Sequence, residues 1–324
     1  MVHHVLLLSL TRGDEAPDEG GRPGRSGTTR QPRVPVLACR DALRTAGATV
    51  DLIEAGSDAD IDDALSLALS STPEAKIIVV VEAVGQLRAV VRRLLRRYAP
   101  PPSSRPPTLP PDRTVHDLPP IGVLPLVGGG AQLGMGSWLG VPQRAEATAA
   151  AVIAGHCRRL DLLRTDAGSV TLDGVVFGAP ARSGAASGAP SGVPSDVPSD
   201  AASGVPSGTG VVARIVVDDM VLSDGGEPLL GAVIANGSGY ATINGLPVLP
   251  GADATDGLLD VAVVASATRK RLRRDAPIEV RRARGRAVSV EPASAAGFVD
   301  DGVPGELTRR RTWWMERAAM AVYA

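Results

Sequence analysis

The stretch KIIVVVEAVGQLRAVVRRLLRRY, residues 76–98, decides the fold of the first half of the chain. Its opening part, Ile77 to Val81, is an unbroken β-branched run, which is typical of a strand buried on both faces. Leu87 to Tyr98 then has the spacing of a helix with arginines on its outer face. A buried strand that leads through a short loop into a helix predicts one unit of a parallel α/β sheet.

The same alternation extends outward from this stretch through residues 1–156. Further strands are predicted at Val5 to Leu10, Ala48 to Glu54 and Ile121 to Leu126. Helices are predicted over residues 35–46, 61–69 and 143–154, the first and last of which end at a glycine. The pattern predicts an α/β domain of three layers with a mostly parallel sheet.

The second half, residues 157–312, is dominated by strand-like segments. They lie at 159–164, 169–177, 211–222, 229–236, 258–264 and 278–290, and the tail 312–323 reads as a last strand. Turn signals such as Asp224-Gly225-Gly226, Asn236-Gly237 and Asn244-Gly245 separate several of them. We therefore expect a β-rich antiparallel sandwich, with a Gly/Ser/Pro-rich insert at 183–210 that is predicted to be disordered.

Composition excludes several classes of function. The 324 residues carry a formal net charge of −1, which argues against a general polyanion binder. Only eight residues are aromatic (three Trp, three Tyr and two Phe), too few for the stacking platforms of a single-strand nucleic-acid binder, so no nucleic acid is expected as partner. The only lysines are Lys76 and Lys270, and neither follows a glycine-rich loop, so the lysine-containing P-loop is absent.

The compartment is also constrained by the sequence. Two cysteines, Cys39 and Cys157, cannot form a disulfide framework and suit a reducing environment. The short apolar run after Val5 reads as a strand rather than a signal peptide, and no apolar stretch approaches the ~18 residues of a membrane span. We expect a soluble, cytoplasmic protein.

Several motifs occur in the order found in a known family. The longest is LLGAVIANGSGYATINGLPVLPGADATDGLLDVAVV at 229–264, followed by FVDDGVPGEL at 298–307. Before them lie IGVLPLVGGGAQLGMGSWLGVP at 121–142 and RRLDLL at 158–163. Together these motifs resemble the diacylglycerol kinase catalytic family, which includes bacterial lipid kinases and sphingosine kinases. The resemblance covers most of the chain and is strongest in the second half.

The resemblance implies a nucleotide-binding α/β domain and a β-rich second domain, with the last strand, about 313–324, returning to the first. It also implies ATP- and magnesium-dependent transfer of a phosphoryl group to a lipid hydroxyl. That chemistry needs backbone amides to hold phosphates, a carboxylate to accept the hydroxyl proton and acidic residues to hold the metal.

The nucleotide loop departs from the family pattern. The family has Gly-Gly-Asp-Gly-Thr after a buried strand, whereas this chain has Glu82-Ala83-Val84-Gly85-Gln86 and retains only Gly85. A glutamate would place a negative charge beside a polyphosphate, so this loop is expected to be disabled for ATP. A second loop, with Gly128, Gly129 and Gly130, is either an anion-binding nest or a flexible hinge; it lacks the spacing of a dinucleotide fingerprint.

Acidic residues supply candidates for the metal and for the base. Asp253, Asp256 and the carbonyl of Leu258 resemble the family's magnesium-binding turn, although the aspartates could equally cap a solvated turn. Asp260, at the start of the next strand, is expected to face solvent.

The family's proton acceptor is the glutamate of Asp-Gly-Glu, but here Asp301-Gly302 is followed by a valine. Glu306 is therefore either the shifted equivalent or an ordinary turn glutamate. Asp300 or Asp301 could substitute for it, and nothing in the sequence selects between them.

Partners and activity stay open at this level. Arginine clusters at 92–97, 269–274, 281–286 and 309–311 are either solvated faces or contacts with anionic lipid head groups, which would place the protein peripherally at the inner membrane face. Two functions from different classes compete: a divergent lipid kinase, and an inactive pseudo-lipid-kinase that binds a lipid or a protein partner. The oligomeric state is not encoded in any recognisable pattern.

Overall fold

The structure is a computed structural model that describes residues 3–10, 33–71, 75–99, 109–110, 113–126, 138–178, 210–240, 242–243, 246–266 and 278–324. The loop containing Gly128, Gly129 and Gly130, residues 183–209 of the predicted insert and the arginine cluster at 269–274 lie outside the described residues. The chain forms two compact units, which we call unit 1 (described residues up to Leu160, together with Ala318–Ala324) and unit 2 (Asp161–Arg317). Strands β5 (Cys157–Thr165) and β17 (Arg311–Tyr323) each begin in one unit and end in the other.

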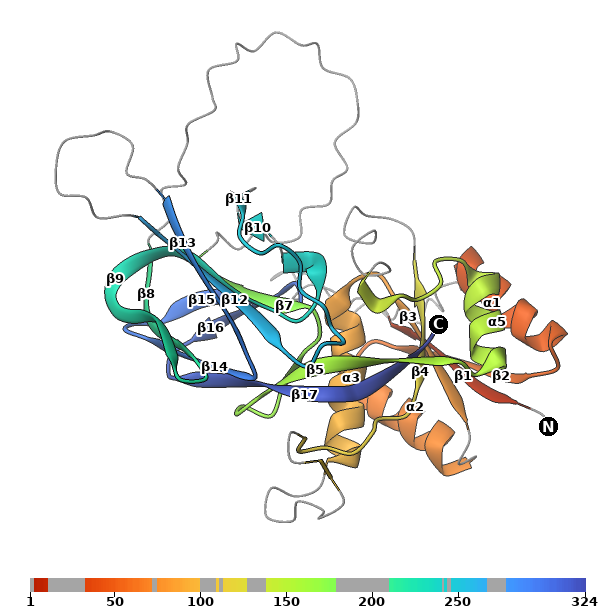
Figure 1. The fold of residues 1–324 in the computed structure, drawn as a ribbon. Coiled ribbons are helices and arrows are strands. Elements are labelled where there is room, and N and C mark those ends of the chain that lie inside the picture. Colours follow the sequence, from red (N-terminus) through yellow and green to blue (C-terminus); the bar gives the residue numbers. More distant parts are fainter. Residues whose placement is uncertain are drawn as a thin grey trace, which may run out of the picture. The chain divides into compact units, whose positions relative to one another are not determined.

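Unit 1 contains a parallel sheet in the order β2-β1-β3-β4 (Figure 1). Its strands are β1 (His4–Leu10), β2 (Thr49–Ala55), β3 (Lys76–Val81) and β4 (Ile121–Pro125). The end of β17 adds a fifth parallel strand, because Val322 pairs with Ile121. All but the first residue of β3 are fully buried, as its β-branched run predicts.

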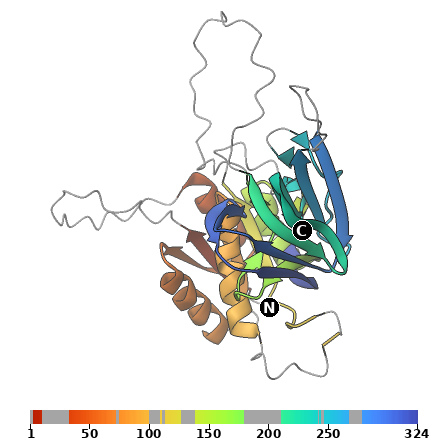
Figure 2. The ribbon, with the colours of Figure 1, turned by 90° about the vertical axis from the view of Figure 1, so that its left-hand side faces the viewer.

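Helices cover both faces of this sheet. Helices α1 (Val34–Thr45) and α5 (Ala145–Ala154) pack together over a core that includes Val5 and Leu7. Helices α2 (Asp58–Ser71) and α3 (Val84–Tyr98) pack against each other on the opposite face (Figures 1 and 2). The expectation of a three-layer, parallel α/β domain is therefore confirmed.

Unit 2 is built from antiparallel strands. Along its main path the order is β16-β15-β7-β9-β8-β14-β17, while β12 pairs with β9 and β13 pairs with β12 (Figures 1 and 2). The bounds of its strands are β6 Val170–Thr171, β7 Gly174–Phe177, β8 Val211–Val217, β9 Met220–Ala235, β10 Thr242–Ile243, β11 Leu246–Pro247, β12 Leu259–Ser266, β13 Ile278–Gly285, β14 Ala287–Pro292, β15 Ala296–Asp300 and β16 Val303–Leu307. A short 3₁₀ helix, η1 (Ser238–Tyr240), follows β9. The β-rich, antiparallel second half that the sequence predicts is confirmed.

Aromatic side chains anchor the core of unit 2. The ring of Phe177 lies 5.9 Å from that of Trp313 in an edge-on arrangement and 5.8 Å from that of Phe298. Trp313 is fully buried, whereas its neighbour Trp314 points the other way and donates from Nε1 to Glu316 at 3.0 Å. Alternation along the strand thus places one of the two tryptophans in the core.

Two predicted strand boundaries are wrong in detail. Asp224-Gly225-Gly226 does not separate two strands, because β9 runs through it. The turn lies earlier, where Val217 pairs with Met220 and Asp218 has a positive φ of 48°. The predicted strand 278–290 is two strands, β13 and β14, which pair with different partners. Within the described part of the chain, no helix is long and apolar enough to cross a membrane.

Candidate functional site

The strand order of unit 1 defines where a ligand site is expected. In open α/β sheets, ligands bind outside the carboxyl ends of the strands, at the point where helices switch from one face to the other. Here that point lies between β1 and β3, which are neighbours in the sheet and lead to helices on opposite faces. The segment from Glu82 to Gln86, which aligns with the family's phosphate loop, follows β3 at this edge.

The backbone amides of this segment already have an acceptor. The Gln86 side-chain oxygen Oε1 accepts hydrogen bonds from the N–H groups of Glu82 at 2.6 Å and Ala83 at 3.3 Å. Its Nε2 donates to the carbonyl of Leu10, at the end of β1, at 3.5 Å. The carboxamide of Gln86 therefore bridges the carboxyl ends of β1 and β3 and takes up donors that a phosphate would need.

A second side chain changes the charge at the same place. The Glu82 carboxylate forms an ion pair with Arg33, the residue just before α1. Gly85 lies in the first turn of α3. Of the predicted nucleotide-binding residues, Gly85 alone falls within the described part of the chain. Two amides of the segment are occupied by Gln86 and its acidic side chain is paired with Arg33, and both features disfavour the triphosphate of ATP.

In unit 2 the motifs that carry the family resemblance converge on one network. Asp161, from RRLDLL, is buried and accepts a hydrogen bond from the N–H of Gly257 at 2.7 Å. Asn236, from the Ala-Asn-Gly turn, is fully buried and donates from Nδ2 to the carbonyls of Asp161 at 3.0 Å and Leu172 at 2.8 Å. Through these contacts, the side chain of one motif fixes the backbone of another.

Asp301 belongs to the same network and is held by backbone donors. Its carboxylate accepts from the N–H groups of Leu172 (2.7 Å), Asp173 (2.8 Å) and Gly174 (3.1 Å). Asp301 and Gly302 both have positive φ, 51° and 80°, and form the two-residue turn between β15 and β16. Asp300 is also buried and accepts from the hydroxyl of Thr171 at 2.8 Å. Both carboxylates thus tie this hairpin to the segment 171–174.

Asp173 is the titratable group with the most unusual environment in this network. Burial, together with the charge of Asp301, raises the pKa of Asp173 from 3.8 to about 7, although the N–H of Gly239 donates to it at 3.0 Å. The hydroxyl oxygen of Tyr240 accepts from the N–H of Gly302 at 2.9 Å, and burial raises the pKa of that hydroxyl. A carboxyl with a pKa near 7 is suited to accept a proton at neutral pH.

The turn predicted to bind a metal ion contains an ion pair with an arginine of the same chain. Asp253 accepts from the N–H and hydroxyl of Thr255 at 3.0 and 2.7 Å. Asp256 accepts from the N–H of Leu258 at 2.9 Å and forms an ion pair with Arg284 of β13. The guanidinium bound to Asp256 would compete with a divalent cation, and no group of three or more potential metal-ligating side chains occurs among the described residues. The assignment of a metal to Asp253, Asp256 and Leu258 stays a prediction.

The expectation that Asp260 faces solvent is wrong. Its residue surface is 4% exposed, because β12 lies between β9 and β13. Asp260 lies directly opposite Arg284 across β12 and β13, and the Arg284 Nε is 3.0 Å from its Oδ1. Burial raises the pKa of Asp260, and the guanidinium offsets part of that effect.

The two candidates for the proton acceptor have very different surroundings. Glu306 lies exposed on β16, where it pairs with Gly297, whereas Asp301 is 2% exposed and bound by three amides. Val303 occupies the position after Asp301-Gly302 and is 43% exposed. The hairpin does not bring Glu306 next to the turn, so its catalytic role stays a prediction.

Sequence reasoning missed the residues that characterise both regions. Asp173 stands in a Leu-Asp-Gly segment that reads as a turn, and only its burial distinguishes it. The cap that Gln86 provides is local, because it accepts from amides three and four residues before it. The ion pairs of Arg33 and Arg284 join residues far apart in the chain, and no local signal identifies them.

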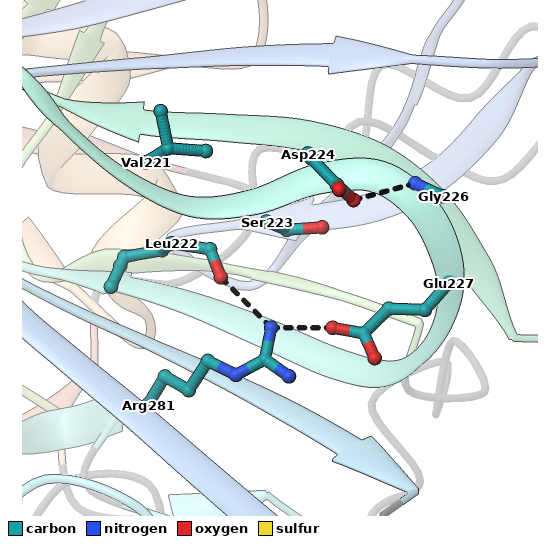
Figure 3. Close-up of a pocket in the computed structure, with 7 residues that line it drawn as sticks. All are labelled: Val221, Leu222, Ser223, Asp224, Gly226, Glu227 and Arg281. Atoms are coloured by element: carbon teal, nitrogen blue, oxygen red, sulfur yellow. Dashed lines mark hydrogen bonds and ion pairs between the residues drawn. The ribbon is translucent and has the colours of Figure 1, made fainter. Parts of the chain in front are cut away.

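Unit 2 also contains an open cavity of about 510 Å³ at the bend of β9 (Figure 3). Its lining consists of Val221, Leu222, Ser223, Asp224, Gly226, Glu227 and Arg281. Arg281 donates to the carbonyl of Leu222 at 3.2 Å and pairs with Glu227 within the cavity and with Glu279 beside it. Because the guanidinium has two carboxylate partners, this cavity carries no excess positive charge for an anion.

Comparison with known proteins gives a clear result at the level of the fold. No known family profile matches the sequence, and no curated protein matches it. Among solved structures, the chain is similar to a diacylglycerol kinase from Bacillus anthracis str. Sterne, with 14% identity, a TM-score of 0.59 and coverage of 99% of this chain and 96% of that chain. A second structure, of a protein assigned as a diacylglycerol kinase from the same organism, gives 14% identity, a TM-score of 0.63 and coverage of 99% and 97%. The chain therefore has the two-domain fold of these lipid kinases.

Proposed function

We propose that this chain is a lipid kinase-like protein that does not transfer phosphate from ATP and that serves as a binding module for a lipid or a protein partner. The observation that carries the proposal is the position of Gln86. Its carboxamide holds the amides of Glu82 and Ala83 at the carboxyl edge of the sheet, where this fold would bind phosphates.

The contacts of residues 82–86 favour the loop in which Gln86 caps the two amides over the same loop with a bound nucleotide. A phosphate would have to displace the Gln86 oxygen from two N–H donors and then lie beside the Glu82 carboxylate. Arg33 offsets part of the charge of that carboxylate, and the ion pair uses the cation that could otherwise have met the phosphate. Repulsion of like charges and the loss of the cap both oppose ATP.

The lipid part of the proposal is supported by fold similarity. Proteins named diacylglycerol kinases share the arrangement of almost the entire chain. Unit 2 retains a tightly connected network around Asp161, Asn236 and Asp301, so its architecture does not depend on the nucleotide loop. A protein with this construction can bind a partner without turnover.

Magnesium-ATP binding, measured by calorimetry and by thermal shift, tests the proposal. A competent site at ~100-fold excess of ligand over Kd would stabilise the folded state by about 2.7 kcal/mol. We expect no heat of binding and no shift at millimolar Mg-ATP, with an active bacterial diacylglycerol kinase of the same fold as positive control. Saturable binding by the wild-type chain, or transfer of labelled phosphate from ATP to diacylglycerol in mixed micelles, would contradict the proposal.

The Gln86→Ala variant probes the cap itself. Removing the carboxamide leaves two amides at the start of α3 without their side-chain acceptor. We expect the midpoint of thermal unfolding to fall, by the equivalent of about 1 kcal/mol for a lost cap. Arg96→Gln, an exposed change in the last turn of the same helix, is the matched control and should have a smaller effect. Equal midpoints for Gln86→Ala and wild type would show that the cap contributes nothing.

An active, divergent lipid kinase is the second candidate, and Asp173 favours it. A carboxyl whose pKa lies at about 7 has the proton affinity that a general base needs at neutral pH. If lipid phosphorylation is observed, Asp173→Asn and Glu306→Gln separate the two possible bases, because only the true base should abolish turnover while Mg-ATP binding persists. Loss of activity in neither variant would remove both from the mechanism.

A further inference from the structure

Unit 2 contains a second cavity, of about 300 Å³, that is lined by three consecutive arginines. They are Arg309, Arg310 and Arg311, which connect β16 to β17, and they face Asp166 and Ala167 in the turn after β5. None of its lining residues belongs to the loop at 82–86 or to the network around Asp301. The arginines form one of the clusters visible in the sequence.

The backbone around the cavity is fixed by a reciprocal pair of hydrogen bonds. The N–H of Asp166 donates to the carbonyl of Thr312, and the N–H of Thr312 donates to Asp166 Oδ2, each at 3.2 Å. The turn is closed by hydrogen bonds between Thr165 and Ser169, with the N–H of Thr165 donating to the Ser169 carbonyl at 3.0 Å. The Asp166 carboxylate is therefore directed toward the strand that carries the arginines.

Two of the guanidinium groups are oriented by neutral neighbours. The Arg310 Nε donates to the hydroxyl of Ser289 at 2.7 Å. The Arg311 guanidinium carbon lies over the ring of Phe298, 5.8 Å from its centroid, which is within the range of a cation–π contact. Neither contact neutralises the positive charge, and both restrict the rotamers that the side chains would otherwise sample.

The arginines of this cluster have fewer carboxylate partners than those of the other two described clusters, in each of which two arginines form ion pairs. In the cluster at 92–97, Arg92 and Arg93 pair with Asp58, and Arg93 also pairs with Asp62. In the cluster at 281–286, Arg281 and Arg284 each have two carboxylate partners. By contrast, no ion pair within the described segments joins the arginines at 309–311 to a carboxylate. Three guanidinium groups and one carboxylate leave the cavity with two positive charges in excess.

We propose that this cavity binds the dianionic phosphomonoester group, either of a soluble phosphate ester or of a phosphatidic acid headgroup. A planar guanidinium presents two parallel N–H donors that match a pair of phosphate oxygens, and the excess charge equals that of a phosphomonoester dianion. Binding would also relieve repulsion among the three neighbouring cations. The inference goes beyond the proposed function and does not depend on whether the chain binds ATP.

Titration calorimetry with glycerol 3-phosphate, at constant ionic strength, tests the site directly. We expect saturable binding to the wild-type chain. The double variant Arg309→Gln/Arg311→Gln should bind at least about tenfold more weakly, since each charge-assisted hydrogen bond contributes that much or more. The single variant Arg309→Gln, which changes only an exposed side chain, should give an intermediate affinity. Arg96→Gln removes the same charge from the exposed end of α3 and should leave the affinity unchanged.

Co-sedimentation with vesicles identifies the source of the phosphate group. Phosphatidylcholine vesicles with and without phosphatidic acid are compared, with glycerol 3-phosphate as competitor. If glycerol 3-phosphate releases the protein from vesicles that contain phosphatidic acid, the proposed site is supported and its ligand is a lipid headgroup. If the protein binds glycerol 3-phosphate but not the vesicles, the site is supported and its ligand is a soluble phosphate ester. The proposal is overturned if the wild type does not bind glycerol 3-phosphate, or if the double variant binds it as tightly. Vesicle binding that glycerol 3-phosphate does not compete overturns it as well, since the attraction is then a surface effect.

Discussion

Replacing Asp173 with asparagine should stabilise the protein above neutral pH. In the folded protein the pKa of this carboxyl is about 7, compared with an ordinary value of 3.8, chiefly because the group is buried. Between these values the folded state binds more protons than the unfolded state, so the free energy of unfolding falls as the pH rises from about 4 to 7. Asparagine keeps the oxygen that accepts from the N–H of Gly239 and removes the charge.

The magnitude follows from the two pKa values. Each unit of pKa difference corresponds to about 1.4 kcal/mol, so ionising Asp173 in the folded protein costs about 4 kcal/mol above pH 7. Part of that cost is already present at pH 5. The stability of Asp173→Asn relative to wild type should therefore increase by about 2.5 kcal/mol between pH 5 and pH 8.

Urea unfolding followed by tryptophan fluorescence measures this difference, because Trp313 and Trp314 both belong to unit 2. The matched control is Asp224→Asn, an exposed aspartate that likewise accepts a backbone N–H, from Gly226 at 2.8 Å (Figure 3). The control should show no such pH dependence relative to wild type. A relative stability of Asp173→Asn that is the same at pH 5 and pH 8 would refute the reasoning, because Asp173 would then not be protonated in the folded state.

Three further outcomes are expected from the same network and core. Asp301→Asn replaces an oxygen that accepts backbone N–H bonds with a donor, and should lower the free energy of unfolding by about 2–4 kcal/mol in urea; a loss below 1 kcal/mol would contradict the structural role of this carboxylate. Gly239→Ala places a Cβ where it overlaps Asp173 Oδ2, and should cost about 1–3 kcal/mol, visible as a lower thermal midpoint, whereas Gly297→Ala, which meets open space, serves as control. Trp313→Ala removes a fully buried ring that packs on Phe177 and should cost about 3–5 kcal/mol, with an unchanged midpoint as the contrary result.

The elements of the fold were predictable because their signals are local. The β-branched run from Ile77 to Val81 has no polar side chain to place on either face, so it specifies a doubly buried strand, and the helix after it follows from its apolar spacing. Asp301-Gly302 specifies a tight hairpin because both residues tolerate a positive φ. The boundary near Asp224 was missed because a glycine pair that reads as a turn is also compatible with a bend within one long strand.

The sequence by itself determined the alternation of elements in unit 1, the β-rich character of unit 2 and the departure of residues 82–86 from a phosphate loop. Only the tertiary structure decided that Gln86 donates to the carbonyl of Leu10 at the end of β1, that Arg284 pairs with Asp256, and that Asp173 is buried beside Asp301. Periodicity and turn chemistry act between near neighbours and can be read from a string. Charge balance and proton affinity depend instead on which distant groups meet in a medium of low dielectric constant, and that is fixed by packing alone.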